Sequence, residues 1–347
     1  MLRGLFLSIA AVFAGPALAA GDIDSCRDAA AEPAARLAAC ETVIADDKIS
    51  GKSKAMAFSV RGDALKKKRD YDGAIAAFNA ALDIDADNVG LINLRGTAYS
   101  DKGDDEHALA DFDHCVKLRP NFASAFNNRG LIFMRRGDLD RAFEDFNSAV
   151  RFVPSGANRY VHLYNRARVQ TLRKQYDAAL ADFDEAQKLN PDASQVAAYR
   201  CVTYTEMKKF DEALADCNEA LAKAPKSSYG LASRGNVYLA KGDLDAAMKD
   251  FDEAIRQGPT NIRAHAGRGQ LHEKRRDFAA ARADYRSASA TLTKYDNADT
   301  AIARRIARER LAALMADLPP RTILAPRPRR PIGRWSIMPA TAWKSAA

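Results

Sequence analysis

The chain has 347 residues, of which 47% are hydrophobic, 28% charged and 8% aromatic, and its formal net charge is +8. This composition is that of a globular protein and excludes collagen-like, disordered and transmembrane-bundle proteins. Seven cations lie at the two ends, Arg3 and six between Pro319 and Ala347, so the body carries only about +1. Non-specific nucleic-acid binding needs a dense field of cations, so we expect no nucleic-acid partner.

Residues 1–19 are predicted to be a cleaved signal peptide. Arg3 precedes an apolar run from Leu5 to Ala14, and Ala17 and Ala19 form a small-x-small cleavage pattern. The alternative is a membrane anchor, but the apolar run is about half of the roughly 20 residues that a spanning helix needs. We therefore expect a periplasmic or secreted protein with no integral membrane segment in the mature chain.

Residues 20–54 are predicted to form an N-terminal helical cap that covers the first unit of the fold. Cys26 and Cys40 flank Pro33, which can separate two short antiparallel helices. An exported protein meets an oxidising compartment in which disulfides form. We therefore predict a disulfide between Cys26 and Cys40.

A repeat occupies the middle of the chain. An arginine followed by a small residue recurs at spacings of 34, 34, 37, 34, 34 and 34. The seven pairs are Arg61-Gly62, Arg95-Gly96, Arg129-Gly130, Arg166-Ala167, Arg200-Cys201, Arg234-Gly235 and Arg268-Gly269. Sixteen residues after each small residue stands Phe78, Phe112, Phe146, Phe183, Cys217, Phe251 or Tyr285. We call these two positions the small slot and the aromatic slot.

This register resembles the tetratricopeptide repeat, with its Gly, Tyr, Ala, Phe and Pro positions, over roughly Ala55 to Thr293. The first-helix Trp of that family is missing, and Arg replaces the usual Leu before the Gly in every copy. The resemblance implies an all-α protein, an α-solenoid that winds as a right-handed superhelix. Seven helix-turn-helix units over residues 55–293 would stand between terminal capping helices.

Each unit is predicted to be a helical hairpin, independently of the resemblance. Six acids, predicted to be N-caps, open the second helices: Asp72, Glu106, Asp140, Asp177, Asp211 and Asp245. Antiparallel packing places the small slot level with the aromatic slot. Cys201 and Cys217 occupy these two slots in one unit, so we predict a second disulfide between them. Cys115 is left over and is expected to be a buried thiol.

The arginine before each small slot has an acidic counterpart fifteen residues after that slot. These acids are Asp111, Asp145, Asp182, Asp216, Asp250 and Asp284, and only the first unit lacks one, because Ala77 stands there. The arginines could form a ladder that binds anions. The favoured interpretation is architectural, with Arg–Asp pairs that link neighbouring helices.

No catalytic motif or metal-binding motif is found. Gly51-Lys52-Ser53 lacks the earlier glycine of a phosphate loop, since Asp46 stands there. The five histidines lack metal-ligand spacing, and no Gly-x-Ser-x-Gly elbow is present. We expect a protein that is not an enzyme and that needs no cofactor or metal.

Two segments follow the repeats. Residues 294–317 are predicted to be a C-terminal capping helix with Ile302, Ile306, Ala313 and Leu314 on its apolar side. Residues 318–347 are predicted to be a disordered, basic, Pro-rich tail that holds both tryptophans.

The resemblance also implies a concave groove lined by first-helix residues that hold a peptide. Residue by residue, the main positions are Asn93, Asn127, Asn128, Tyr164, Asn165, Arg168, Tyr199 and Asn236, and further positions are Ser59, Asp63, Lys66, Thr97, Leu131, Val202 and Gln270. Asparagine and tyrosine side chains can bond the backbone of an extended segment. A plain polar, solvated face is the alternative.

The sequence therefore predicts an exported, non-catalytic scaffold that binds a protein or peptide segment in its groove. In an alternative function, the basic tail, with Trp335 and Trp343, docks on an anionic envelope surface and the solenoid serves as a spacer. The identity of the partner and the oligomeric state are left open.

Overall fold

The computed structural model describes residues 16–156, 158–291 and 298–316, and within them it contains helices and no strand. The first helices are α1 (Pro16–Arg27), α2 (Pro33–Ala45), α3 (Lys52–Lys67), α4 (Tyr71–Leu82), α5 (Val89–Lys102) and α6 (Asp105–Leu118). The central ones are α7 (Ala123–Arg135), α8 (Leu139–Phe152), α9 (Arg159–Leu172), α10 (Tyr176–Leu189), α11 (Ser194–Glu206) and α12 (Phe210–Lys223). The last are α13 (Ser228–Lys241), α14 (Leu244–Gln257), α15 (Ile262–Lys274), α16 (Phe278–Ala290) and α17 (Ala298–Ala316).

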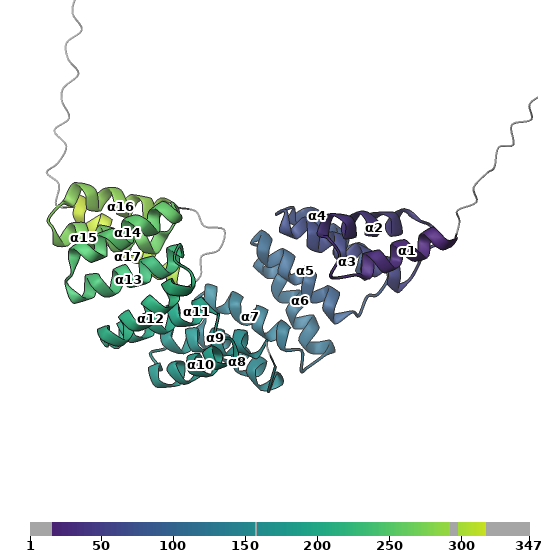
Figure 1. Ribbon diagram of the computed structural model, residues 1–347, viewed down its shortest axis with the longest axis horizontal. Helices are drawn as coiled ribbons and strands as arrows, with labels where there is room; N and C mark the ends of the chain where they lie inside the picture. Colours follow the sequence, from purple (N-terminus) through teal and green to yellow (C-terminus); the bar gives the residue numbers. More distant parts are fainter. Residues whose placement is uncertain (1–15, 157, 292–297, 317–347) are drawn as a thin grey trace, which may run out of the picture.

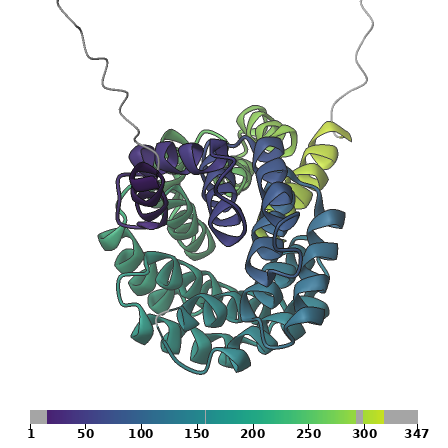
Figure 2. The same cartoon turned by 90° about the vertical axis from the view of Figure 1, so that its right-hand side faces the viewer.

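Helices α3 to α16 form seven consecutive hairpins, and each hairpin packs on the next. The hairpins follow one another along a curved solenoid, with α1 and α2 at one end and α15 to α17 at the other (Figure 1). Viewed from the side, they wind around a common axis (Figure 2). The first helices of neighbouring hairpins contact one another, so α3, α5, α7, α9, α11, α13 and α15 form the inner layer.

The start of each second helix differs from the prediction by two residues. Asp70 caps α4, and its side chain accepts a hydrogen bond from the backbone N–H of Gly73. The predicted cap, Asp72, lies in the first turn and pairs with Lys102 of the next hairpin at 2.7 Å. Glu106 likewise pairs with Arg136, at 2.7 Å. These acids therefore link neighbouring units and do not cap helices.

The true caps of the other second helices follow the same register. They are Asp104, Asp138, Gln175, Lys209, Asp243 and Asp277, and those of α10 and α12 make no side-chain cap hydrogen bond. A residue with positive φ precedes each cap, and it is Arg69, Gly103, Gly137, Lys174, Lys208, Gly242 or Arg276. The left-handed residue turns the chain so that the next residue can cap the second helix.

Close helix packing explains why the small slot is small. A Cβ atom added to Gly96 would lie 2.7 Å from Phe112, and one added to Gly235 would lie 2.8 Å from Phe251. Both distances are shorter than real Cβ contacts, and both aromatic rings are fully buried. The small slot and the aromatic slot therefore meet in the core of each hairpin, as predicted.

The six predicted Arg–Asp pairs are present in the second to seventh units. In each pair Nε and Nη2 of the arginine donate to the two carboxylate oxygens at 2.7–2.9 Å. These hydrogen bonds raise the pKa of Arg129 and Arg200 above the usual value. Such bidentate geometry gives a strong and directional link between the two helices of a hairpin.

Each of these arginines also reaches the preceding hairpin, which the sequence analysis did not anticipate. Nη1 donates at 2.6–2.8 Å to an oxygen of Asn79, Asp113, Asn147, Asp184, Asn218 or Asp252. All six acceptors lie two residues after the Arg-pairing position of their own unit. Each arginine therefore joins three helices, and we call the whole set the arginine ladder.

The structure brings together both predicted cysteine pairs. The Cα atoms of Cys26 and Cys40 are 4.8 Å apart, and those of Cys201 and Cys217 are 5.4 Å apart. Both separations suit a disulfide. Cys115 is fully buried, and burial raises the pKa of its thiol to about 12. A thiol with that pKa is unreactive at neutral pH.

Helix α17 packs only partly through the predicted apolar side. Its buried residues are Ala303, Arg304, Ala307 and Leu314, of which only Leu314 was on that side, whereas Ile302 is 39% exposed and Ala313 is exposed. The two alanines allow α17 to approach α15 and α16 closely, and the helix also contacts α7 of the inner layer. It therefore lies against the inside of the solenoid.

The predicted leader and tail lie almost wholly outside the described residues, which leave out 1–15 and 317–347. No helix in the described part of the chain is both long enough and apolar enough to cross a bilayer.

Candidate functional site

A chain of side-chain amides crosses the inner layer from α5 to α9. Asn128 Nδ2 donates to Asn93 Oδ1 at 3.0 Å, and Asn127 Nδ2 donates to Asn128 Oδ1 at 3.3 Å. Asn165 Nδ2 donates to Asn127 Oδ1 at 2.9 Å, and Arg168 Nη1 donates to Asn165 Oδ1 at 3.2 Å. These five predicted groove residues therefore form one network.

Two members of this network are less accessible to a bound peptide than predicted. Asn127 is 7% exposed and Asn165 is 4% exposed, so they satisfy each other inside the protein. Sequence spacing places both on the inner helix, but it cannot show that their amides meet across the repeat. Removal of the Asn165 amide is therefore expected to lower stability as well as to alter the groove.

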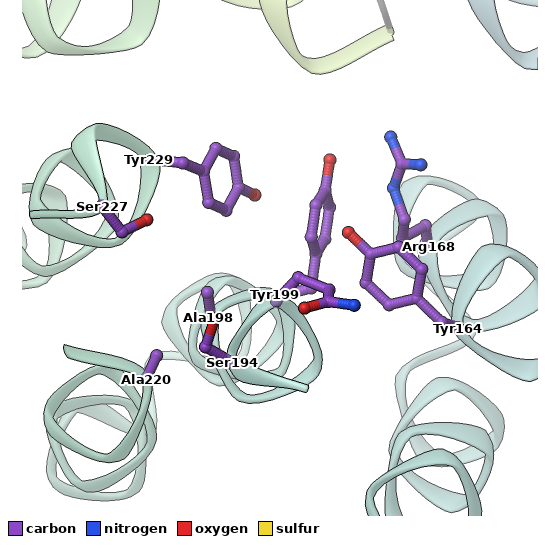
Figure 3. A pocket seen from close by; sticks show the side chains of 9 residues that line it. Tyr164, Arg168, Ser194, Ala198, Tyr199, Ala220, Ser227 and Tyr229 are labelled. Carbon is purple, nitrogen blue, oxygen red and sulfur yellow. The ribbon is translucent and has the colours of Figure 1, made fainter. Parts of the chain in front are cut away.

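Three tyrosines gather where α9, α11 and α13 meet. The rings of Tyr164 and Tyr199 pack edge to face with centroids 5.5 Å apart, and those of Tyr199 and Tyr229 stack at 5.1 Å. Figure 3 shows the ring of Tyr199 between the other two, with its hydroxyl directed away from its own helix. We call these residues the tyrosine cluster.

Two arginines lie over the tyrosine cluster. The guanidinium carbon of Arg168 is 4.6 Å from the centroid of the Tyr199 ring and 5.4 Å from that of Tyr164. The guanidinium carbon of Arg263 is 5.3 Å from the centroid of the Tyr229 ring. Cation–π contacts of this kind hold a guanidinium flat against a ring.

One hydroxyl of the cluster is buried without a hydrogen bond. Oη of Tyr199 is shielded from solvent and makes none within the described residues. Burial also raises the pKa of Tyr229 to about 12. A buried hydroxyl without a hydrogen bond costs free energy, so the Tyr199 hydroxyl can gain a hydrogen bond from an occupant of the site.

Two cavities border this region. The smaller, of about 320 Å³, is lined by Tyr164, Arg168, Tyr199, Tyr229 and the start of α11 (Figure 3). The larger, of about 510 Å³, lies between the inner layer and α17. Arg168 and Tyr199 line both cavities, so the two spaces adjoin. We call them together the tyrosine–arginine site.

The predicted groove residues divide into two sets. Tyr164, Arg168, Tyr199 and Asn236 line the tyrosine–arginine site, as do Val202 and Gln270. Near the other end, Ser59 borders a separate pocket, and Lys66 Nζ donates to Thr97 Oγ1 at 3.1 Å. The structure therefore concentrates the candidate site at the fourth to seventh units.

Several lining residues were missed by the sequence analysis. Tyr229 and Arg263 both stand six residues before their small slots, so their shared register was a usable signal. Ile302, Arg305 and Ile306 of α17 also line the larger cavity, but no repeat register relates α17 to the groove. In the described residues no three His, Cys, Asp or Glu side chains are grouped so that they could hold a metal ion.

Comparison with protein families agrees with the repeat architecture. Profiles described as tetratricopeptide repeat match residues 57–88, 93–157 and 164–228, and one described as TPR repeat matches residues 235–275. The chain therefore belongs to the tetratricopeptide repeat family, and its repeats make it a protein-interaction scaffold. No curated protein sequence matched it.

Solved structures show the same fold at low sequence identity. A tetratricopeptide repeat protein from Parabacteroides merdae is 17% identical with a TM-score of 0.60, and the match covers 73% of this chain and 98% of that one. A match to the Cut9–Hcn1 hetero-tetramer of APC/C has 12% identity and a TM-score of 0.59. It covers 82% of this chain and 53% of that one. Yeast Tom70 is 16% identical with a TM-score of 0.52, and the match covers 91% of this chain and 71% of that one.

Proposed function

We propose that this protein is an exported, non-catalytic scaffold that holds a segment of a partner protein in its concave groove. The observation that carries the proposal is the tyrosine–arginine site itself. It combines aromatic rings, buried hydroxyls and the amides of Asn236 and Gln270 on one inner surface. Such a surface offers apolar contact and hydrogen bonds to the backbone of a bound segment.

Export is supported by the cysteines. Two pairs at disulfide separation suit an oxidising compartment, and the leader of residues 1–19 has the pattern of a signal peptide. N-terminal sequencing of the protein from its native envelope tests this part. A mature N-terminus directly after residue 19 supports export, whereas an intact Met1 on membrane-bound protein contradicts cleavage.

Affinity capture tests the groove. Full-length protein and a Tyr199→Ala/Asn236→Ala variant are used to capture partners from an envelope extract, and the bound proteins are identified by mass spectrometry. We expect a partner that the wild type retains and the variant loses by about tenfold or more. Lys188→Ala, an exposed change on α10, is the control and should retain the partner.

Deletion of residues 318–347 separates the groove from the alternative in which the basic tail targets a surface. If the groove binds the partner, the shortened chain still captures it. Salt-sensitive envelope binding that disappears with the tail would instead assign the function to the tail.

A further inference from the structure

The charges around the larger cavity are strongly one-sided. Arg168 of α9, Lys174 after α9, Arg263 of α15 and Arg305 of α17 line it, and Glu206 is the acid among its lining residues. These cations come from separate segments around the cavity, so they suit several carboxylates spread along a chain better than one isolated anion. An anionic occupant is favoured and a cationic one is opposed.

The unbonded hydroxyl of Tyr199 points to the same chemistry. Tyr199 is 5% exposed, and its hydroxyl oxygen makes no hydrogen bond within the described chain. This hydroxyl can donate a hydrogen, and the neighbouring arginine and amide groups are also donors. A carboxylate is an acceptor with several lone pairs, so it matches a site in which donors predominate.

Apolar side chains separate these polar groups. Leu172, Val202, Ile302 and Ile306 line the same cavity, and Ile302 remains 39% exposed there. Apolar residues of an occupant could cover this surface while acidic ones meet the cations. The occupant therefore combines both residue types in one segment.

Building on the proposed use of the groove, we propose that the tyrosine–arginine site binds an extended partner segment in which acidic and apolar residues alternate. Its side-chain carboxylates bind the cations and the hydroxyl of Tyr199. Helix α17 forms one wall of the site, so this wall is supplied by the chain's own C-terminal helix.

Binding of synthetic peptides to the full chain tests the proposal. The probe is a short fluorescein-labelled peptide in which glutamates alternate with leucines, and its counterpart has glutamine at every glutamate. Fluorescence anisotropy at moderate salt should show the glutamate peptide binding at least about tenfold more tightly. Raising the salt concentration should reduce this preference, because it rests on charge.

Two variants test whether the peptide binds in the cavity. Tyr199→Phe should weaken the glutamate peptide about three- to tenfold and leave the melting temperature unchanged or higher, since it removes an unbonded buried hydroxyl. Tyr238→Phe on α13, away from the site, is its control. Arg305→Gln should weaken the same peptide about tenfold, whereas Arg256→Gln on α14 should not.

The outcomes separate this proposal from the broader function. Equal binding of the two peptides overturns the carboxylate proposal while leaving a groove that binds segments by their backbone. Failure of both peptides to bind, with natural-partner capture still lost in Tyr199→Ala/Asn236→Ala, also overturns the carboxylate proposal alone. A glutamate preference unaffected by Tyr199→Phe and Arg305→Gln would place binding elsewhere and overturn it too.

Discussion

The first repeat and the six that follow are held together differently. In the later units each arginine before the small slot binds an aspartate bidentately and also reaches the preceding hairpin. In the first unit Ala77 replaces the aspartate, and Arg61 pairs with Glu41 at 3.5 Å, with both side chains more than 40% exposed. The N-terminal end has instead a disulfide-distance pair, Cys26 and Cys40, in the hairpin that covers it.

The difference shows how a solenoid treats its ends. A unit in the middle has a neighbour on both sides, so one arginine can connect three helices in a partly buried setting. A unit at the end has no preceding repeat, and an exposed ion pair contributes little there. A covalent link in the cap supplies order that the arginine ladder cannot.

The largest effect is expected from breaking the ladder. Arg129→Gln strands the carboxylate of Asp145, whose side chain is 6% exposed, and should lower the free energy of unfolding by about 3 to 5 kcal/mol. Arg61→Gln in the first unit is the control and should cost less than about 1 kcal/mol. Urea unfolding followed by circular dichroism measures both. Equal losses at the two positions would refute the contrast between the regions.

The second effect concerns the cap. Cys26→Ala/Cys40→Ala should destabilise the N-terminal end by about 3 kcal/mol, because the pair closes a short loop. Hydrogen exchange should show faster opening of α1 to α3, with α9 to α16 unchanged, since stability in repeat arrays is passed mainly between neighbours. Uniform loss of protection along the whole chain would contradict this picture.

A smaller loss of stability is expected in the seventh unit, at the C-terminal end of the solenoid, when the pH is lowered. Burial raises the pKa of Asp284, but hydrogen bonds from His265 and Arg268 outweigh it and hold that pKa below the usual value. A carboxyl whose pKa is lowered by folding stabilises above its unfolded pKa, near 3.8, and loses this contribution as the pH falls through the folded value.

His265→Phe removes one of these hydrogen bonds and should therefore reduce the stability gained between acid and neutral pH. Urea unfolding at several pH values measures this gain, and His114→Phe, at an exposed position, is the control. An unchanged pH dependence in His265→Phe would show that the hydrogen bond from His265 does not set the pKa of Asp284.

The smallest effect is expected in the turn between the two helices of a hairpin, which both regions share. Arg69 in the first unit and Lys208 in the fifth both have positive φ, 64° and 60°. Glycine adopts this conformation without strain, so Arg69→Gly and Lys208→Gly should each stabilise by about 0.5 to 1 kcal/mol. Thermal unfolding should show similar gains, and a loss in either variant would mean that the side chain makes a needed contact.

Features set by position within the repeat could be predicted from the sequence. Hairpin packing at Gly96 and Phe112, the six Arg–Asp pairs and both cysteine pairs follow from a constant register, because the same offset produces the same contact in every unit. The acceptors from Asn79 to Asp252 obey that register too. They were not predicted because they join different units, whereas the predicted Arg–Asp pairs lie within one unit.

Features that depend on contacts outside the register could not be predicted. Asn127 and Asn165 are buried because their amides meet across two neighbouring inner helices. Their units are separated by the irregular 37-residue spacing, so the 34-residue register does not predict this contact. The helical period of α17 allowed more than one apolar face, and the approach through Ala303 and Ala307 was decided by packing on α15 and α16. The sequence therefore could not predict that α17 forms part of the site.

We expect the arginine ladder to provide stability and the tyrosine–arginine site to provide binding. Arg166 and Arg168 lie two residues apart on α9, and the first binds Asp182 while the second lies over Tyr199. The most direct measurement is to compare Arg166→Gln and Arg168→Gln for both urea stability and binding of the glutamate peptide. We predict that Arg166→Gln loses about 3 kcal/mol of stability, whereas Arg168→Gln loses less than about 1 kcal/mol but binds about tenfold more weakly. Matching losses of stability and binding in the two variants would contradict this division of roles.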